Sequence, residues 1–85
     1  MAFALTERVQ AVETGYGLVL LDERAGRYWR LNETGTVVVA ALLAGDAPEQ
    51  AAGQLARRFD ITEDDARRDV AALVDGLRAA GLVAA

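Results

Sequence analysis

At residues 27–32 the chain reads Arg27-Tyr28-Trp29-Arg30-Leu31-Asn32, and the spacing of its apolar residues changes at this point. Before Asn32, short runs rich in β-branched and aromatic residues are separated by turns that contain glycine, which is typical of strands. After Asn32, apolar residues recur every three or four positions, which is typical of amphipathic helices. The sequence therefore predicts strands first and helices second.

Three strands are expected before Asn32. Their predicted ranges are 8–12, 18–21 and 27–31, and the turns between them lie at 14–17 and 22–26. Gly26 suits the positive φ that such hairpin turns often need. Strands joined by loops this short form an antiparallel meander.

Three helices are expected after Asn32. The first covers 35–44, with Asn32 or Thr34 as its cap and Gly45 at its end. The second begins at Asp46-Ala47-Pro48-Glu49, which resembles a capping box with an aspartate cap, and runs to about Phe59.

The third helix is predicted to start at Thr62, whose hydroxyl caps it, and to continue to Ala80. Gly81 ends it, and Leu82-Val83 folds back as the hydrophobic contact. The expected fold class is thus α+β in the order βββααα. A small antiparallel sheet with three helices describes a winged helix-turn-helix-like unit, here formed by residues 1–85 as a single domain.

Residue types that are absent narrow the function. The 85 residues include no Cys, His, Ser or Lys, and all nine basic residues are Arg. Disulfides, thiolate nucleophiles, structural zinc sites and the usual nucleophile–base pairs therefore cannot be built. A carrier protein with a serine-linked phosphopantetheine arm is excluded as well. We expect a protein that is not an enzyme, with no catalytic residues, no metal site and no cofactor.

Charge and hydropathy disfavour two classes of partner. The net charge of −4 and the pI near 4.6 argue against nucleic acid, because Lys and Arg supply most of the affinity for phosphate. The longest apolar run, Val37 to Ala44, is far shorter than the ~20 residues that a membrane span needs. The N-terminus lacks the charged and apolar regions of a signal peptide. A cytoplasmic protein is expected.

Apolar side chains are predicted on both faces of the sheet. They occupy 18–21 on the second strand and Tyr28, Trp29 and Leu31 on the third, whereas three helices can cover only one face. The apolar side chains that the helices leave uncovered either shield the rim of the sheet or form a surface that a partner covers. The third helix carries one apolar stripe, which is mostly core and has one flank exposed for a partner. The stripe consists of Ala66, Val70, Leu73, Val74 and Leu77.

The third strand is also expected to have an open edge. It contains no proline, and only Arg27 and Arg30 flank its aromatic residues. An open strand edge beside an apolar helix is what an extended peptide needs in order to dock, since main-chain bonds set its register and pockets select its side chains. The helix itself is a poor reader of DNA, because its acidic residues outnumber its arginines.

The ordered combination of these residues resembles the PqqD-like family of peptide-recognition elements. The resemblance covers about residues 7–83 and is most like the stand-alone leader-binding proteins of lasso peptide biosynthesis. Its motifs are Gly26-x-Tyr28-x-x-Leu31-Asn32-x-Thr34-Gly35, an apolar helix that ends at Leu42-x-x-Gly45, and Asp69-Val70-x-x-Leu73-x-x-x-Leu77-x-x-x-Gly81-Leu82-Val83.

The resemblance implies that the chain binds the leader segment of a precursor peptide. In the family, the leader adds as a strand to the third strand and lies against the third helix. Carried over to this sequence, the peptide-binding residues are Arg27, Tyr28, Trp29, Arg30, Leu31, Asp69, Val70, Leu73, Val74 and Leu77. Lasso leaders of this type commonly show a Tyr-x-x-Pro-x-Leu pattern. The arginines would pair with acidic leader positions, and Asp69 with a basic one.

The resemblance also implies partners. These are the precursor leader, a leader peptidase of the cysteine protease class and a cyclase, with the chain itself a monomer or a weak homodimer. Tyr28 and Trp29 alternate, so at most one of them lines the groove. Three other readings stay open: a chaperone that delivers a precursor to a radical enzyme, a winged-helix transcription factor, and a dimerisation module.

Overall fold

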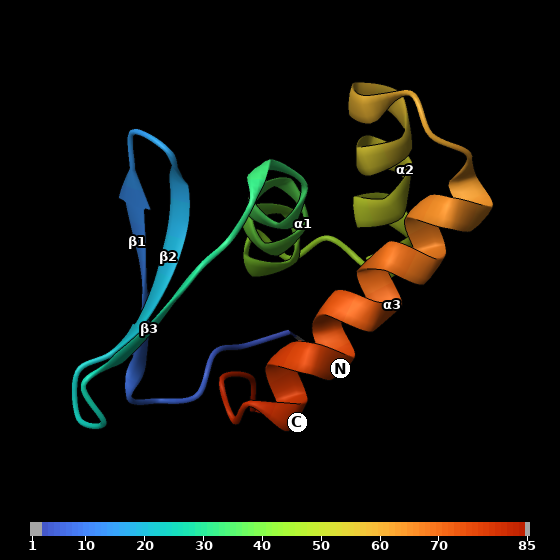
Figure 1. Cartoon of the computed structure of the whole chain (residues 1–85). Coiled ribbons are helices and arrows are strands. Elements are labelled where there is room, and N and C mark those ends of the chain that lie inside the picture. Colours follow the sequence, from blue (N-terminus) through green and yellow to red (C-terminus); the bar gives the residue numbers. More distant parts are fainter. Residues whose placement is uncertain (1–2, 85) are drawn as a thin grey trace.

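The computed structural model describes residues 3–84 and has the expected α+β order. Along the chain, three strands precede three helices, and Figure 1 shows how they are arranged in space. The elements are β1 (Val9–Thr14), β2 (Gly17–Asp22), β3 (Arg27–Arg30), α1 (Glu33–Leu43), α2 (Pro48–Phe59) and α3 (Glu63–Ala79). The strands form one antiparallel sheet in the order β1-β2-β3, which confirms the predicted meander.

The two hairpins depend on turns that a few residues fix. Gly17 has a φ of 127°, and a Cβ there would lie 2.7 Å from Oγ1 of Thr36, so both conformation and space favour glycine. Oγ1 of Thr36 instead accepts the N–H of Leu18 at 3.1 Å, which ties β2 to α1. Gly26, in the β2–β3 turn, has the expected positive φ of 66°.

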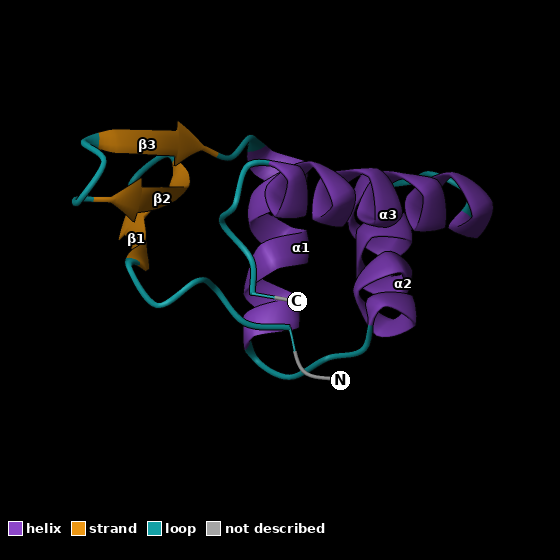
Figure 2. Ribbon diagram, turned by 90° about the horizontal axis from the view of Figure 1, so that it is seen from below, coloured by secondary structure: helices purple, strands orange, loops and turns teal. Residues whose placement is uncertain are grey.

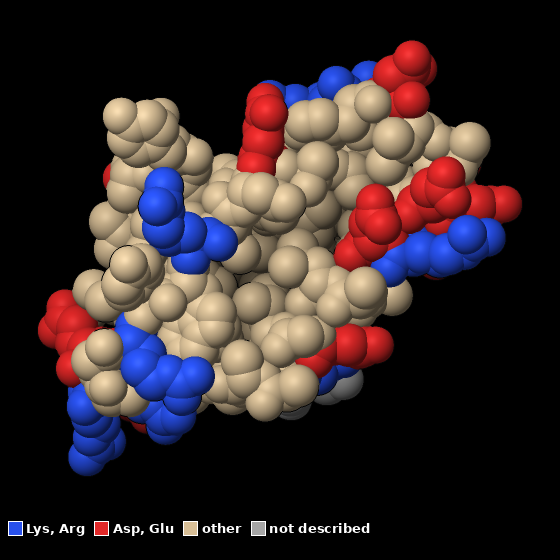
Figure 3. All heavy atoms as spheres, viewed as in Figure 1, with Lys and Arg blue, Asp and Glu red and all other residues tan. Residues whose placement is uncertain are grey.

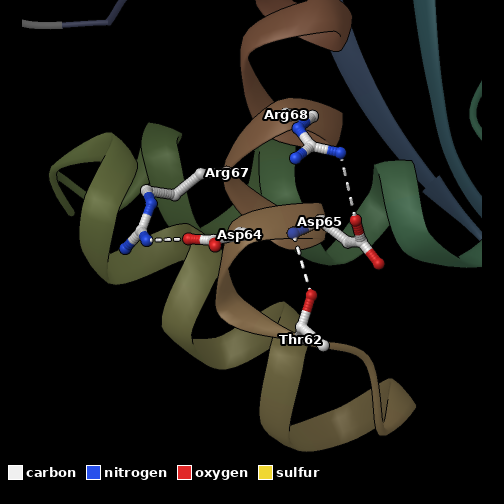
Figure 4. A network of polar contacts seen from close by, with 5 residues as sticks. All are labelled: Thr62, Asp64, Asp65, Arg67 and Arg68. Carbon is white, nitrogen blue, oxygen red and sulfur yellow. Dashed lines mark hydrogen bonds and ion pairs between the residues drawn. The ribbon is translucent and has the colours of Figure 1, made fainter.

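The caps of α1 and α3 follow the sequence. Asn32, rather than Thr34, caps α1, because its Oδ1 accepts the N–H of Gly35 at 2.8 Å. The hydroxyl of Thr62 accepts the N–H of Asp65 at 3.1 Å and so caps α3 (Figure 4). Beyond α3, Gly81 takes a positive φ of 76°, and the chain turns back as predicted.

The predicted aspartate cap of α2 is wrong. Ala47 occupies the cap position, and its N–H donates to Oε1 of Gln50 at 2.8 Å. Asp46 lies one residue earlier and accepts from Nε2 of Gln54 at 2.7 Å. Since Pro48 fixes the first helical φ and has no N–H to satisfy, α2 begins there without a side-chain acceptor.

Two adjoining clusters of buried residues form the core. One lies among the three helices and contains Val38, Ala41, Leu42, Ala51, Ala52, Leu55, Ala66 and Val70. The other joins the sheet to α1, α3 and the residues after α3, and contains Val9, Leu20, Val39, Leu77, Leu82 and Val83. In Figure 2 the sheet stands to one side of the helices, so helices cover only one of its faces.

The segments at the two ends of the described chain pair with each other. Leu5 and Val83 form an antiparallel bridge. The N–H of Thr6 donates to the carbonyl oxygen of Leu82 at 2.8 Å, and the N–H of Ala84 donates to that of Ala4 at 2.9 Å. The chain before β1 therefore closes against the residues after α3 (Figure 1).

A partly buried ion pair lies at the start of the β2–β3 turn. Asp22 has a side chain only 5% exposed, and its Oδ2 accepts Nε of Arg8 at 2.9 Å. Its Oδ1 accepts the N–H of Ala25 at 3.1 Å. Two hydrogen bonds hold the pKa of the Asp22 carboxyl below its usual value, and the one from Arg8 has a larger effect than the one from the N–H of Ala25.

Candidate functional site

Within residues 3–84, β3 has a neighbouring strand on one side only. The N–H of Leu31 donates to the carbonyl oxygen of Leu18 at 3.0 Å, in the register that continues through Leu20–Trp29 to Asp22–Arg27. Main-chain groups alternate in direction along an antiparallel pair. Arg27, Trp29 and Leu31 therefore direct their main chain toward β2, whereas Tyr28 and Arg30 direct theirs to the open edge.

The same alternation separates the two aromatic side chains of β3. Trp29 lies opposite the buried Leu20 and packs against the cluster that joins the sheet to α3, so it faces the helices. Tyr28 lies on the outer face and is 64% exposed. Trp29 is therefore the aromatic residue of β3 that lies on the face toward α3, a choice that the sequence left open.

Arg27 shares the inner face with Trp29. Its guanidinium carbon lies 4.7 Å from the centroid of the Trp29 ring, which is within the range of a cation–π contact. Among residues 3–84 no carboxylate pairs with Arg27. The stack therefore holds an unneutralised positive charge at the start of β3.

The predicted residues of α3 separate into three groups. Val70 and Leu77 are buried in the two core clusters and expose almost no surface. Val74 is half-buried on the flank toward α2, where it lines two cavities together with Pro48 and Arg78. Leu73 packs against both clusters, and Asp69 lies one turn before it with an exposed side chain.

Asp69 and Leu73 meet the start of α1 in a cavity of about 330 Å³. Its other lining residues are Asn32, Thr34, Gly35, Val38, Leu55 and Ala72. The helices α1, α2 and α3 each line the cavity with an apolar side chain, from Val38, Leu55 and Leu73 respectively. Its polar lining residues are Asn32, Thr34 and Asp69. In Figure 3 the surface between the strands and α3 is hollowed and uncharged, with arginines over the strands and acidic residues over the first half of α3.

Two ion pairs neutralise most of the acidic start of α3. Arg67 pairs with Asp64, and NH1 of Arg68 lies 3.4 Å from Oδ1 of Asp65 (Figure 4). Both pairs join residues three apart on the same helix, the spacing at which oppositely charged side chains stabilise helices. Within the described part of the chain, Asp69 has no such partner.

Comparison with known proteins identifies this arrangement. Residues 17–83 match the sequence profile of PqqD, described as coenzyme PQQ synthesis protein D. The chain belongs to the PqqD family. Its members are recognition elements of ribosomally made, modified peptides, so this PqqD-family chain is a non-catalytic peptide-binding domain. A search of curated proteins returned no match.

Two solved structures are similar over nearly their whole length. "Lasso peptide synthetase B1 complexed with the leader peptide" is 39% identical, with 100% of both chains covered and a TM-score of 0.93. "TbiB1 in Complex with the TbiA(beta) Leader Peptide" is 20% identical, with 98% of this chain and 94% of that chain covered and a TM-score of 0.85. The second comparison supports the fold alone.

This PqqD-family chain also has an uncovered apolar patch on the outer face of its sheet. Val12, Val19, Leu21 and Tyr28 form it, and cross-strand pairs join Val12 to Val19 and Leu21 to Tyr28. Val12 is 40% exposed, whereas Val19 and Leu21 are half-buried. The expectation that three helices leave part of the apolar surface facing solvent is therefore confirmed.

Sequence reasoning missed several of the residues that line the cavity at the start of α1. It named Asp69 and Leu73 as binding residues but not Thr34, Gly35 or Ala72, which line the same cavity. One available signal was spacing, because Ala72 lies three residues after Asp69 on a helix and so shares its face. No group of three or more potential metal ligands occurs among residues 3–84, and no helix in that range is long and apolar enough to span a bilayer.

Proposed function

We propose that this PqqD-family chain binds the leader segment of a lasso precursor peptide as a fourth strand of its sheet. The observation that carries the proposal is the open edge of β3, whose free main-chain groups belong to Tyr28 and Arg30. Beside that edge, the hollow between the strands and α3 forms a groove (Figure 3), and Trp29 and Leu73 pack against the same core cluster there. The edge supplies register and the groove supplies side-chain selectivity.

The geometry assigns different roles to the predicted residues. A leader residue opposite Trp29 forms a pair without main-chain hydrogen bonds, in which Cα atoms approach to about 4.5 Å and side chains lie close together. Trp29, Leu31 and Leu73 would thus contact every second leader side chain, while Tyr28 and Arg30 contribute main-chain bonds. Val70 and Leu77 hold α3 in place from the core.

The comparison with lasso peptide synthetase B1 favours a lasso pathway over its rivals. That relative shares 39% identity over the full length of both chains, and its structure contains a leader peptide. The family description names quinone cofactor synthesis, but it applies to the family as a whole. We propose further that the chain acts in the cytoplasm and presents its leader to a leader peptidase and then to a cyclase.

Titration with a synthetic leader tests this function. The probe is a peptide that carries the Tyr-x-x-Pro-x-Leu pattern, and matched peptides replace its Tyr or Leu by Ala. We expect binding that saturates at micromolar concentrations and weakens with either replacement. No binding of the parent peptide at tens of micromolar (about 6–7 kcal/mol) would contradict the proposal. A steep fall of affinity for duplex DNA with added salt would support a transcription factor instead.

A further inference from the structure

The groove has opposite charges at its two ends. At the start of β3, Arg27 is held over Trp29 and has no carboxylate partner within residues 3–84. Beyond the end of β3, Asp69 lies in the cavity with Asn32 and Gly35, likewise without an ion-pair partner in the described range. Figure 3 shows an uncharged, hollowed surface between the strands and α3, and an added strand would lie on this surface.

Nearby charges do not cancel this polarity. Asp64 and Asp65 are paired with Arg67 and Arg68 on α3. Arg30 stands on the outer face with Tyr28, because it alternates with Trp29 along β3. The inner face of β3 therefore presents one positive group, and the facing turn of α3 presents one negative group.

The two charged ends are far enough apart to act separately. Leu31 lies four positions after Arg27, about 13 Å along a strand, and Asp69 lies beside the next residue, Asn32. This separation exceeds the Debye length of about 8–10 Å at ordinary ionic strength, so each group acts mainly on the guest side chain next to it.

We infer that this polarity selects the charge order of the leader: a basic side chain on the N-terminal side of the paired segment and an acidic one on the C-terminal side. The inference rests on the proposed function. An antiparallel guest extends the antiparallel sheet with the more stable ladder and enters at the Asp69 end. Its inward-facing residues occupy alternate positions, so the basic and acidic residues stand four or six positions apart.

Two synthetic peptides of identical composition test the inference. Both carry the Tyr-x-x-Pro-x-Leu core. One has Arg two residues before the Tyr and Glu six positions later, between the Pro and the Leu, and the other has these two residues exchanged. We expect the chain to bind the first about tenfold more tightly, since two exposed ion pairs become two repulsions in the second. This preference should shrink at high salt.

A charge-exchanged variant, Arg27→Glu with Asp69→Arg, should reverse the preference while the net charge stays the same. The matched control exchanges Asp75→Arg with Arg78→Asp on the flank of α3 toward α2, and it should keep the original preference. Circular dichroism before each titration verifies that the variants are folded.

The outcomes separate the two proposals. Equal affinity for both peptides, or the same preference in the charge-exchanged variant, would overturn the inference and leave leader binding intact. A failure of both peptides to bind the unaltered chain would overturn the proposed function itself. A nitroxide at the N-terminal end of the bound peptide should broaden amide signals near Asn32 and Asp69. Broadening near Arg27 instead would overturn the antiparallel direction.

Discussion

The N–H of Leu31 donates to the carbonyl oxygen of Leu18 at 3.0 Å, and this bond sets the direction of each main-chain group in β3. Because direction alternates along an antiparallel pair, the free N–H groups at the edge are those of Tyr28 and Arg30. The relationship makes strand addition testable one peptide group at a time.

Tyr28→Pro removes one outward N–H without removing a bond to β2. Edge strands tolerate proline at such positions, so the domain should stay folded. We expect leader affinity about two- to tenfold below that of Tyr28→Ala, which loses the side chain but keeps the N–H. Calorimetric titration of both variants measures the difference. Equal affinities would mean that the guest does not pair with this edge.

Trp29 is the only tryptophan, and it faces the groove. A leader that lies against it should exclude water from the indole and shift its fluorescence emission to shorter wavelength. The shift should saturate in parallel with binding measured by calorimetry. The variant Tyr28→Phe, altered on the opposite face, should show the same shift. An unchanged emission spectrum at saturation would place the guest elsewhere.

Leu77→Ala and Leu73→Ala should have different effects. Leu77 is buried, so its truncation should lower the free energy of unfolding by about 2–5 kcal/mol with little change in the affinity of the folded protein. Leu73 is half-buried and lines the groove cavity, so its truncation should cost less stability and more affinity. Urea unfolding and peptide titration give the two quantities. The reverse pattern would exchange the roles of these residues.

Asp22 should make stability fall in acid. Its pKa in the folded protein lies below the usual value because Arg8 and the N–H of Ala25 stabilise the carboxylate. The stabilisation is therefore complete above the unfolded pKa of about 4 and is lost as the pH falls through the lower folded value. The Asp22→Asn variant should have a lower free energy of unfolding at neutral pH than the parent chain. Its free energy of unfolding should also fall less than the parent's as the solution is made acidic.

Thermal unfolding from pH 7 to pH 2 measures this dependence. Glu23→Gln is the matched control, since it removes an exposed carboxylate from the same turn and should leave the pH profile of the parent chain unchanged. If Asp22→Asn and the parent lost stability in parallel below pH 4, another carboxylate would be responsible.

The order and type of all six elements were predictable because local signals agree with the tertiary structure. Asn32 and Thr62 occupy cap positions, and Gly81 takes the positive φ that ends α3. The start of α2 was not predictable, because both Asp46 and Ala47 could occupy its N-cap position. Pro48 and the bond from Ala47 to Gln50 decide it, and a pattern based on acceptor side chains alone misses both.

The candidate site was predictable as a region but not as a surface. Strand alternation separates Tyr28 from Trp29, yet only the packing of β3 against Leu20 and α3 decides which one faces inward. Likewise the apolar stripe of α3 was visible, but its division into core residues such as Leu77 and a groove residue such as Leu73 depends on where α1 and the sheet lie.

The antiparallel bridge between Leu5 and Val83 has a mechanical consequence. The outermost bond joins Ala84 to Ala4, and the next joins Thr6 to Leu82. A force that pulls the two ends apart loads these bonds one after another, as in a zipper, rather than together in shear. Such a force would peel Leu82 and Val83 from the core before it strained the sheet.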